Sequence, residues 1–496
     1  MTAGEAAALP PRVITDVTEK TFFGHPRALA TLFLTEMWER FSYYGLRAIL
    51  MLFMVAPASQ GGLGLSVGEA AGVYALYGAS VYMMALPGGW IADRVLGQRL
   101  AVLIGGTVIA IGHFTMLINN VLFIYIGLVV IVIGTGLLKP NMSTMVGGLY
   151  AKDDPRRDSG FSIFYMGINV GALLAPLVVG YLGQDVDWNI GFAAAGIGML
   201  LGLGQYVYGW RYLGEVGHHP SHPVPRAERN PLVLRIGLGG GAIIALLAVV
   251  LAVGGFETTE YVIDGLIVAL PVVYFGRTLV APGRTAVERS RLYALIVLFA
   301  ASAVFWLVSD QGGTIFTVFA QDDTNDSVFG IGFPASWFGS LDPIFILLLA
   351  PVLAWLWVKL GERQPSTPVK FSLGLLLCAA SMGVMVFAGV AAESGKVSPL
   401  WRIAMNLIGT AGELALSPVG LSASTKLAPQ AAVGTTMGIW FLSTSVGDVC
   451  GGQFAKLYDA VSLPVYFGLL GLVAAAAGIA LLLVVRPVVK LMAGIR

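Results

Sequence analysis

The chain has 496 residues, of which 57% are hydrophobic and only 11% are charged. Soluble proteins carry about 25% charged residues, so this composition excludes an ordinary soluble domain and predicts a membrane protein. The net charge of +1 gives no indication of a nucleic-acid partner. Cys378 and Cys450 are the only cysteines, and both lie in apolar runs, so we expect packing residues rather than a disulfide or a metal site.

Long apolar stretches recur along the chain, and a transmembrane helix needs roughly 20 mostly apolar residues. Fourteen stretches meet this length, so the sequence predicts an all-α polytopic membrane protein with 14 transmembrane helices. An even number of spans puts both ends of the chain on one side of the membrane. The predicted spans are residues 27–54, 68–92, 98–119, 121–149, 159–183, 190–213, 232–254, 261–280, 290–320, 335–360, 370–391, 399–427, 431–456 and 463–487.

Lysine and arginine are distributed unequally between the connecting loops. The loops near 55–67, 184–189, 255–260 and 321–334 carry none, and Lys396 is the clear exception to the pattern. Because cytoplasmic loops are enriched in Lys and Arg, we expect both termini in the cytoplasm and the protein in the inner (plasma) membrane. The basic loops hold Arg94, Arg99, Lys152, Arg156, Arg157, Arg226, Arg229, Arg284, Arg289, Arg291, Arg363, Lys370 and Lys426.

A polar linker and an unusual pair of spans divide the chain. The linker, EVGHHPSHPVPRAERNP, follows the sixth span, and the next two spans hold almost no intramembrane charge. We interpret these two spans as a hairpin inserted between two six-helix bundles, with a substrate site where the bundles meet near the middle of the membrane. The predicted divisions are a cytoplasmic tail at 1–25, a first bundle at 26–214, the linker at 215–231, the hairpin at 232–282, a second bundle at 283–488 and a cytoplasmic tail at 489–496.

The first span carries four charges in the stretch TEMWERFSYYGLRAIL. Charges inside a membrane are costly, so they face a cavity, pair with one another and usually mark function. At the helical step, the charged and tyrosine side chains fall within an arc of about 140°. A structural ion pair between helices is one interpretation, but four charges exceed what packing needs, and a proton and ligand site is the other. The stripe consists of Glu36, Glu39, Arg40, Tyr43, Tyr44 and Arg47.

Charge in the other spans is sparse. Lys139 in GLLKPNMS is expected to need a partner carboxylate, unless it snorkels to the cytoplasmic interface. Asp310 lies in WLVSDQGG and Glu413 in GELALSP. Asp342 precedes Pro343, so it is either a functional carboxylate or a turn residue. A proton or substrate pathway is therefore expected to involve these side chains.

Three segments resemble signatures of the proton-dependent oligopeptide transporter family, a branch of the major facilitator superfamily. They are ExxERFxYYG at 36–45, FYMGINVGALLAP at 164–176 and GELALSPVGLS at 412–422. The segment GGWIADRVLGQR at 88–99 resembles the superfamily's loop between spans two and three. The resemblance extends from about residue 20 to residue 490 and implies a major facilitator fold, with twelve core spans and a bacterial-type hairpin. That fold agrees with the independent count of spans.

The resemblance implies a proton-coupled symporter that imports di- and tripeptides by alternating access, with no cofactor and no enzymatic activity. It assigns proton coupling to Glu36, Glu39, Arg40 and Asp310. It places the peptide's carboxylate at Arg47 and Lys139, its backbone at Asn169 and its amino terminus at Glu413. Other candidate substrate-binding residues are Tyr43, Tyr77, Trp306, Asp342, Trp440, Phe441 and Ser443.

The gating residues implied by the resemblance come from both halves of the chain. Lys139 and Asp310 would form a pair between the bundles, and we expect Asp93, Arg94 and Arg99 to control the cytoplasmic end. In this interpretation Asp93 holds a neighbouring helix N-terminus and Arg99 a nearby carboxylate.

Some features leave alternatives open. Family members often have Asn where Asp342 stands, and animal members have a proton-linked His in the second span, which is absent here. His113 is expected to be a packed, hydrogen-bonded residue, and His218, His219 and His222 to be solvated in the linker. The aromatic residues in the spans are candidate pocket walls or ordinary packing residues.

Competing functions are also considered. The sequence holds no phosphate-binding loop of the GxxxxGK[ST] type and no cluster of metal ligands, so ATP-driven pumping and metalloenzyme activity lack support. Efflux, another anionic substrate such as nitrate, or a receptor or channel on a transporter fold remain as alternatives. Cations at one side of the expected site and Glu413 at the other favour a zwitterionic substrate instead.

Overall fold

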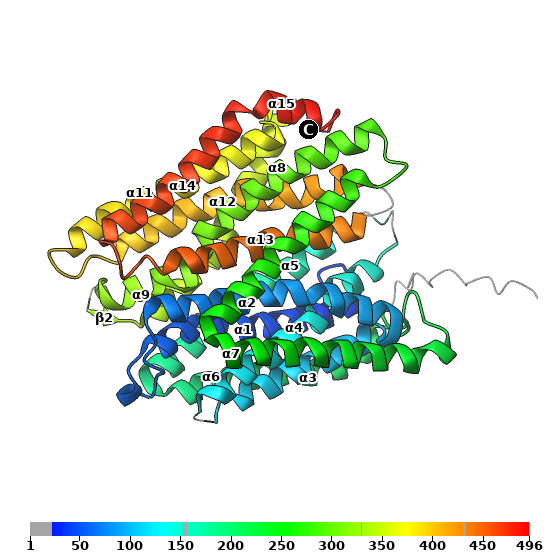
Figure 1. The fold of residues 1–496 in the computed structure, drawn as a ribbon, viewed down its shortest axis with the longest axis horizontal. Helices are drawn as coiled ribbons and strands as arrows, with labels where there is room; N and C mark the ends of the chain where they lie inside the picture. Colours follow the sequence, from blue (N-terminus) through cyan, green and yellow to red (C-terminus); the bar gives the residue numbers. More distant parts are fainter. Residues whose placement is uncertain are drawn as a thin grey trace, which may run out of the picture.

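The computed structural model describes residues 22–118, 120–151, 154, 156–328, 330–429 and 433–495. The predicted N-terminal tail up to residue 21, the last residue of the C-terminal tail and the first residues of the span predicted at 431–456 lie outside the described part. Figure 1 shows the helices of the first bundle, blue to cyan, in the lower part of the view and those of the second bundle, yellow to red, in the upper part.

The first bundle has six long helices. Helix α1 packs against α5 and α6, and α3 packs against α4. Short π-helical segments, Ala92–Leu96, Pro176–Gly180 and Leu182–Val186, extend α2 and α5. The helices are α1 (Arg27–Val55), α2 (Val67–Ile91), α3 (Gln98–Thr115), α4 (Val121–Gly148), α5 (Arg157–Ala175) and α6 (Trp188–Gly209).

The hairpin is the helix α7 (Arg226–Val280), which non-helical backbone at Gly255, with φ of 74°, divides into two arms. The positive φ favours glycine, so the turn between the arms depends on this residue. The second arm packs against α13 (Val433–Ala455) of the second bundle and α7 also contacts α2 of the first. The second arm carries Glu257, Glu260 and Asp264 in its first turns, and of these three only Asp264 lies within the predicted span 261–280.

The second bundle follows, and its first span is interrupted. The predicted single span 290–320 consists of α8 (Ala286–Ser309), a 3₁₀ turn at Asp310–Gly313 and α9 (Ile315–Asp322). A short β-hairpin follows, with two residues in each strand, β1 (Ser327–Val328) and β2 (Ile331–Gly332). A 3₁₀ segment, Ala335–Ser340, then leads to the next helix. The remaining helices are α10 (Leu341–Leu360), α11 (Thr367–Ala392), α12 (Leu400–Leu427), α13, α14 (Leu463–Leu483) and α15 (Val485–Leu491).

Sequence signals explain where the helices begin. Ser66 and Glu69 form a capping box at the start of α2, and Thr285 and Glu288 form one at the start of α8. These reciprocal bonds satisfy backbone N–H groups that have no partner within the helix. Ten helical segments in the described part are long and apolar enough to cross a membrane by length and composition. Helix α1, with its polar stripe, is not among them.

We call the end of the molecule where α1 begins the basic end, because the loops rich in Lys and Arg lie there. At the opposite end, the two bundles are joined by hydrogen bonds. Gln184 donates from Nε2 to Oε1 of Gln321, and the backbone N–H of Ser336 donates to Oε1 of Gln184 at 3.1 Å. Nearer mid-span, Ser340 Oγ donates to the carbonyl oxygen of Leu173 at 2.8 Å. The bundles are therefore held together at the end opposite the basic end.

Candidate functional site

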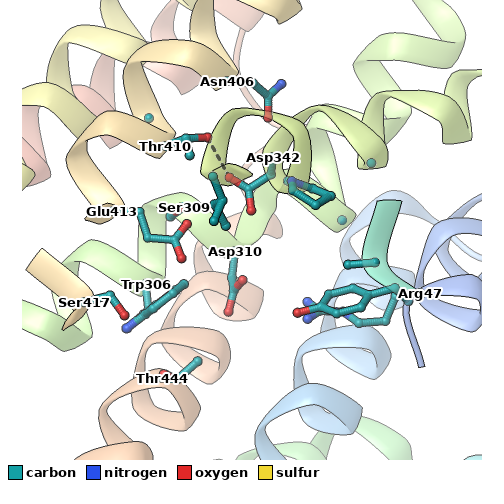
Figure 2. A pocket seen from close by; sticks show the side chains of 18 of the residues that line it. Arg47, Trp306, Ser309, Asp310, Asp342, Asn406, Thr410, Glu413, Ser417 and Thr444 are labelled. Atoms are coloured by element: carbon teal, nitrogen blue, oxygen red, sulfur yellow. Dashed lines mark hydrogen bonds between the residues drawn. The ribbon is translucent and has the colours of Figure 1, made fainter. Parts of the chain in front are cut away.

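A central cavity of about 380 Å³ lies between the two bundles. Its walls come from α1, α2, α4 and α5 on one side and from α8 to α13 on the other. Figure 2 shows three carboxylates of the second bundle and Arg47 of the first bundle around the same space. The cavity therefore lies where the sequence predicts a substrate site, between the halves of the chain.

The first bundle contributes a positive wall. Arg47 donates from Nε to the hydroxyl of Tyr74 at 2.7 Å and from Nη1 to that of Tyr43 at 3.3 Å. Lys139 Nζ lies 4.0 Å from the centroid of the Tyr82 ring, a cation–π contact. Aromatic partners thus hold both cations in place, and both line the cavity.

The second bundle contributes a negative wall. Asp310, Asp342 and Glu413 line the cavity, and Figure 2 shows their side chains gathered on the side away from Arg47. Thr410 donates from Oγ1 to Oδ1 of Asp342 at 2.6 Å, which fixes that carboxylate. The cavity consequently has cations on one wall and carboxylates on the other.

Breaks in regular helix place two of these carboxylates. Asp310 opens the 3₁₀ turn that follows α8, and Asp342 lies in the first turn of α10, next to Pro343. A carboxylate in the first turn is stabilised by the helix dipole. Asp342 therefore lies at a helix start, as the turn interpretation expects, and it also lines the cavity. Its functional role stays a prediction.

Most of the predicted substrate residues line this cavity. Asn169 is buried and donates from Nδ2 to the carbonyl oxygen of Tyr165 at 3.0 Å. Ser443 is hydrogen-bonded to Ser302 at 2.9 Å. The predicted residues on the cavity wall are Arg47, Lys139, Asn169, Trp306, Asp310, Asp342, Glu413, Trp440, Phe441 and Ser443.

Tyr43 and Tyr77 differ from this expectation, because neither is among the residues lining the cavity. Their rings stack with centroids 6.1 Å apart, and both side chains are buried. Tyr43 lies behind Arg47, whose position it supports by a hydrogen bond. Tyr44, which belongs to the predicted stripe of the first span, does line the cavity. The sequence reasoning did not identify three further tyrosines on the cavity wall, which come from α2 and α5, namely Tyr74, Tyr82 and Tyr165.

The predicted proton-coupling cluster is assembled and buried. Arg40 donates from Nη2 to Oε1 of Glu39 at 2.6 Å and from Nε to Oε2 of the same carboxylate. Arg40 Nε is 3.6 Å from Oε1 of Glu36, and Oε2 of Glu36 has no hydrogen-bond partner. The guanidinium also lies 4.7 Å from the centroid of the Tyr43 ring. Glu36 is therefore less firmly bound than Glu39.

Asp448 on α13 was missed by the sequence reasoning. It is buried and lines a small cavity that also contains Arg47, Tyr74 and Asp310. One of its oxygens, Oδ2, has no hydrogen-bond partner. The rule that singled out Glu413, a carboxylate within an apolar span, applies equally to this residue and would have found it.

Lys139 and Asp310 face the same cavity but are not paired in this conformation. Among the residues that the structure describes, no ion pair joins the two. Lys139 instead lies over Tyr82. A pair that gates transport would form in one conformation and break in another, so its formation stays a prediction.

The residues predicted to gate the cytoplasmic end hold the linker. Asp93 Oδ1 accepts hydrogen bonds from Ser221 at 2.7 Å and Gln98 at 3.2 Å. The backbone oxygen of Arg94 accepts from the N–H of Val224 at 3.2 Å. The expectation that Arg99 binds a carboxylate was wrong for this conformation, because Nη2 donates to carbonyl oxygens at the end of the first bundle and the start of the linker. Those acceptors belong to Gly214, at 2.5 Å, and Val216, at 3.0 Å.

The histidines divide as expected, with one addition. His113 is buried and its Nε2 is hydrogen-bonded to Ser42 Oγ at 2.7 Å, which fits a packed residue. His218 and His219 are exposed in the linker. Together with Glu215 they bring potential metal-ligand atoms within 4.8 Å of one another, a grouping that the sequence reasoning did not identify.

Two helical bundles enclose a cavity with cations on one wall and carboxylates on the other. This fold and site define the chain as a secondary solute transporter of the major facilitator type. The POT family model matches residues 99–469. The chain belongs to the POT family.

Relatives of nearly full length support this assignment. The chain is 46% identical over 484 residues to the uncharacterized transporter YclF of Bacillus subtilis (strain 168), covering 96% of this chain and 97% of the relative. It is 42% identical over 494 residues to a di-/tripeptide transporter of Lactococcus lactis subsp. cremoris, covering 97% and 99%. The likeness therefore includes both bundles and the hairpin.

Solved structures give the same result. A peptide transporter POT in complex with sulfate has a TM-score of 0.91 and 45% identity, covering 96% of this chain and 97% of that one. A POT family transporter in complex with 5-aminolevulinic acid has a TM-score of 0.90 and 37% identity, covering 95% and 98%. These matches cover the 14-helix arrangement that the sequence predicts.

Proposed function

We propose that the chain is a proton-coupled symporter that imports di- and tripeptides by alternating access. The observation that carries this proposal is the cavity itself, with Arg47 and Lys139 on one wall and Asp310, Asp342 and Glu413 on the other. A zwitterionic peptide needs two opposite poles held apart. Relatives in Lactococcus lactis are named di-/tripeptide transporters, which supports the same substrate class.

The peptide lies with its carboxylate toward Arg47 and Lys139 and its amino terminus toward Glu413. An arginine offers a planar fork that suits a carboxylate, and the tyrosines around Arg47 orient that fork. Among the residues that the structure describes, none forms an ion pair with Glu413 that would compete for an incoming ammonium group, whereas Asp342 is already bound by Thr410. Asn169, which also lines the cavity, would bond the peptide backbone.

Protons enter through the cluster of Glu36, Glu39 and Arg40, with Asp310 as the partner in the second bundle. Glu36 is the carboxylate best suited to exchange a proton, because Oε2 has no partner while Glu39 is held at two points. Carboxylates inside a membrane commonly serve as proton relays. Protonation of this cluster would then change its attraction for Arg40 and for neighbouring cations.

Alternating access requires each end of the cavity to open in turn. The hydrogen bonds around Gln184 support a state in which the end opposite the basic end is closed. Formation of the Lys139–Asp310 pair accompanies the switch to another state. Asp93, Arg94 and Arg99 hold the linker against the first bundle at the basic end during this movement.

The distribution of Lys and Arg supports an inner-membrane location with both termini in the cytoplasm. The proposed divisions of the chain are the tail at 1–25, the bundles at 26–214 and 283–488, the linker at 215–231 and the hairpin at 232–282. The C-terminal residues 489–496 form a second cytoplasmic segment.

Uptake of labelled dialanine by proteoliposomes that contain the purified chain tests the proposal. A symporter concentrates the peptide when the lumen is alkaline. A channel equilibrates the peptide without concentrating it, and an exporter gives no inward accumulation. Nitrate as a competitor tests the alternative of a simple anionic substrate, which the carboxylates on the second wall disfavour.

A further inference from the structure

Arg402 is a third cation on the wall of the central cavity, and the two-pole arrangement gives it no role. It lies in the first turn of α12, in the second bundle, whereas Arg47 and Lys139 come from the first. Its side chain is among the largest that are fully buried, with 2% exposure for the residue. An arginine is almost never fully buried unless it is paired.

The guanidinium of Arg402 lacks such a pair. Its Nε and Nη1 have no hydrogen-bond partner, and within the described part of the chain no ion pair includes it. It lies 5.2 Å from the ring centroid of Phe316 and 5.5 Å from that of Phe338. Aromatic faces offset only part of the cost of a buried cation, so the Nε and Nη1 donors stay unsatisfied in this conformation.

A second unpartnered polar group lies on the same wall. Ser336 is 2% exposed, its Oγ has no hydrogen-bond partner, and it lines the cavity with Arg402. Both phenylalanines that face the guanidinium line it as well. The second-bundle wall of the cavity thus combines a cation, a hydroxyl and aromatic rings.

The carboxylates of the cavity do not serve as the missing partner in this conformation. Asp342 is bound by Thr410, which lies eight residues beyond Arg402 on the same helix, or about 12 Å along the axis. Glu413 lies three residues further along. Glu413, and the residue that binds Asp342, are therefore displaced along α12 from Arg402.

We propose that Arg402, assisted by Ser336, forms a second anion subsite that binds an additional carboxylate of the substrate, as in a peptide with a glutamate or aspartate side chain. The inference rests on the proposed peptide transport. The planar guanidinium binds a carboxylate through two parallel hydrogen bonds, and the hydroxyl can donate a third. Peptides with acidic side chains gain affinity from this subsite, whereas dialanine does not reach it.

Paired competitors test the subsite. Inhibition of labelled dialanine counterflow is measured with Ala-Glu and Glu-Ala, each compared with its neutral counterpart, Ala-Gln or Gln-Ala. In the Arg402→Gln variant, the preference for the acidic peptide over its neutral counterpart, measured as the ratio of their inhibition constants, falls by about tenfold for at least one pair. The reason is that a charged hydrogen bond is lost. Arg402→Lys restores part of it, since the charge is kept without the fork.

Three outcomes overturn the subsite. One is an unchanged ratio for both pairs in Arg402→Gln, and another is an equal loss for acidic, neutral and dialanine substrates, which indicates a structural or gating role. The third comes from replacing chloride and sulfate with gluconate. If this replacement changes dialanine transport by the wild type but not by Arg402→Gln, an inorganic anion occupies the site. Failure of wild-type counterflow with dialanine contradicts the proposed transport instead, so the two failures are distinct.

Discussion

Arg40 and Glu39 form a two-point ion pair inside α1. Nη2 of Arg40 donates to Oε1 of Glu39 at 2.6 Å, and Nε donates to the other oxygen. Glu36, one turn earlier, is 3.6 Å from the same guanidinium and keeps one oxygen without a partner. Two acids that are equivalent by sequence spacing thus have different surroundings. We therefore propose Glu36 as the acid that takes a proton without breaking the pair.

Replacing Glu36 with Gln is expected to abolish proton-driven accumulation of dialanine while leaving counterflow at least partly intact. The amide keeps the shape of the side chain but cannot exchange a proton, and counterflow needs no net proton movement. Both rates are measured in proteoliposomes at matched protein density. Normal acid-stimulated uptake by this variant would remove Glu36 from the proton pathway.

Glu39→Gln is expected to abolish proton-driven accumulation as well, but with an added loss of stability. The variant leaves the buried guanidinium of Arg40 without its main partner, which typically costs about 3–5 kcal/mol. Thermal unfolding in detergent measures this loss, with Glu36→Gln as the matched control. Equal melting temperatures for the two variants would contradict the difference in their roles.

Lys139→Ala and Asp310→Ala are each expected to nearly stop uptake. The two residues come from different bundles and face one cavity, so a pair between them can form and break as the bundles move. A double-mutant cycle on peptide binding should show coupling of at least about 1 kcal/mol. Strict additivity would mean that the residues never meet during transport.

Glu413→Gln is expected to weaken binding of peptides with a free amino terminus. The variant should affect N-acetylated dialanine much less, because that ligand has no ammonium group to lose a partner. Competition constants for dialanine and its N-acetylated form are compared in wild type and variant. If the ratio of the two constants stays the same, Glu413 does not hold the amino terminus.

The sequence predicted the fold closely because the bilayer restricts it. Apolar length is a local property, and it indicated an all-helical membrane protein. The exact bounds of the linker and the hairpin stay a prediction, and α7 begins at Arg226, within the predicted linker. The interruption at Asp310–Gly313 was not predicted, because the surrounding span is apolar enough to look continuous. The π-helical segments that extend α2 and α5 were missed for the same reason.

Side-chain partners were harder to predict than positions. A helical stripe correctly places Arg47 and Tyr43 on one face, but it cannot tell that Tyr43 supports Arg47 from behind while Tyr74, from another helix, binds it at the cavity. Asp448 could have been predicted by applying to it the same rule that singled out Glu413, that a charged residue within an apolar span usually marks function. Arg402 lies near a predicted span end, where a basic residue is usually explained by the interface.

The hairpin provides a prediction about stability. Lys456 Nζ is 3.1 Å from Oε2 of the buried Glu260, and Gln453 Nε2 donates to both Glu260 and Asp264 at 2.8 Å. Gly72 of α2 lies directly against this cluster, since a Cβ added there would lie 2.6 Å from Oε1 of Glu260. The cluster therefore joins the hairpin to α13 and abuts α2.

Lys456→Met is expected to lower the free energy of unfolding by roughly 1–3 kcal/mol, because it leaves the buried carboxylate of Glu260 without its cation. Thermal unfolding in detergent measures the effect. Lys396→Met, which changes an exposed lysine, serves as the control. Adding Glu260→Gln to Lys456→Met should recover part of the loss. If Lys456→Met melts at the same temperature as the control Lys396→Met, the ion pair does not hold the hairpin.

The most direct test of the proposed function is simultaneous measurement of dialanine and proton entry into proteoliposomes that contain the purified chain. With an alkaline lumen, labelled dialanine should rise above its external concentration, and a lumenal pH dye should report acidification that depends on the peptide. Collapsing the pH gradient with an ionophore should reduce the peptide to its equilibrium level. Peptide entry that only reaches equilibrium under a maintained gradient, without coupled acidification, would contradict proton-coupled symport.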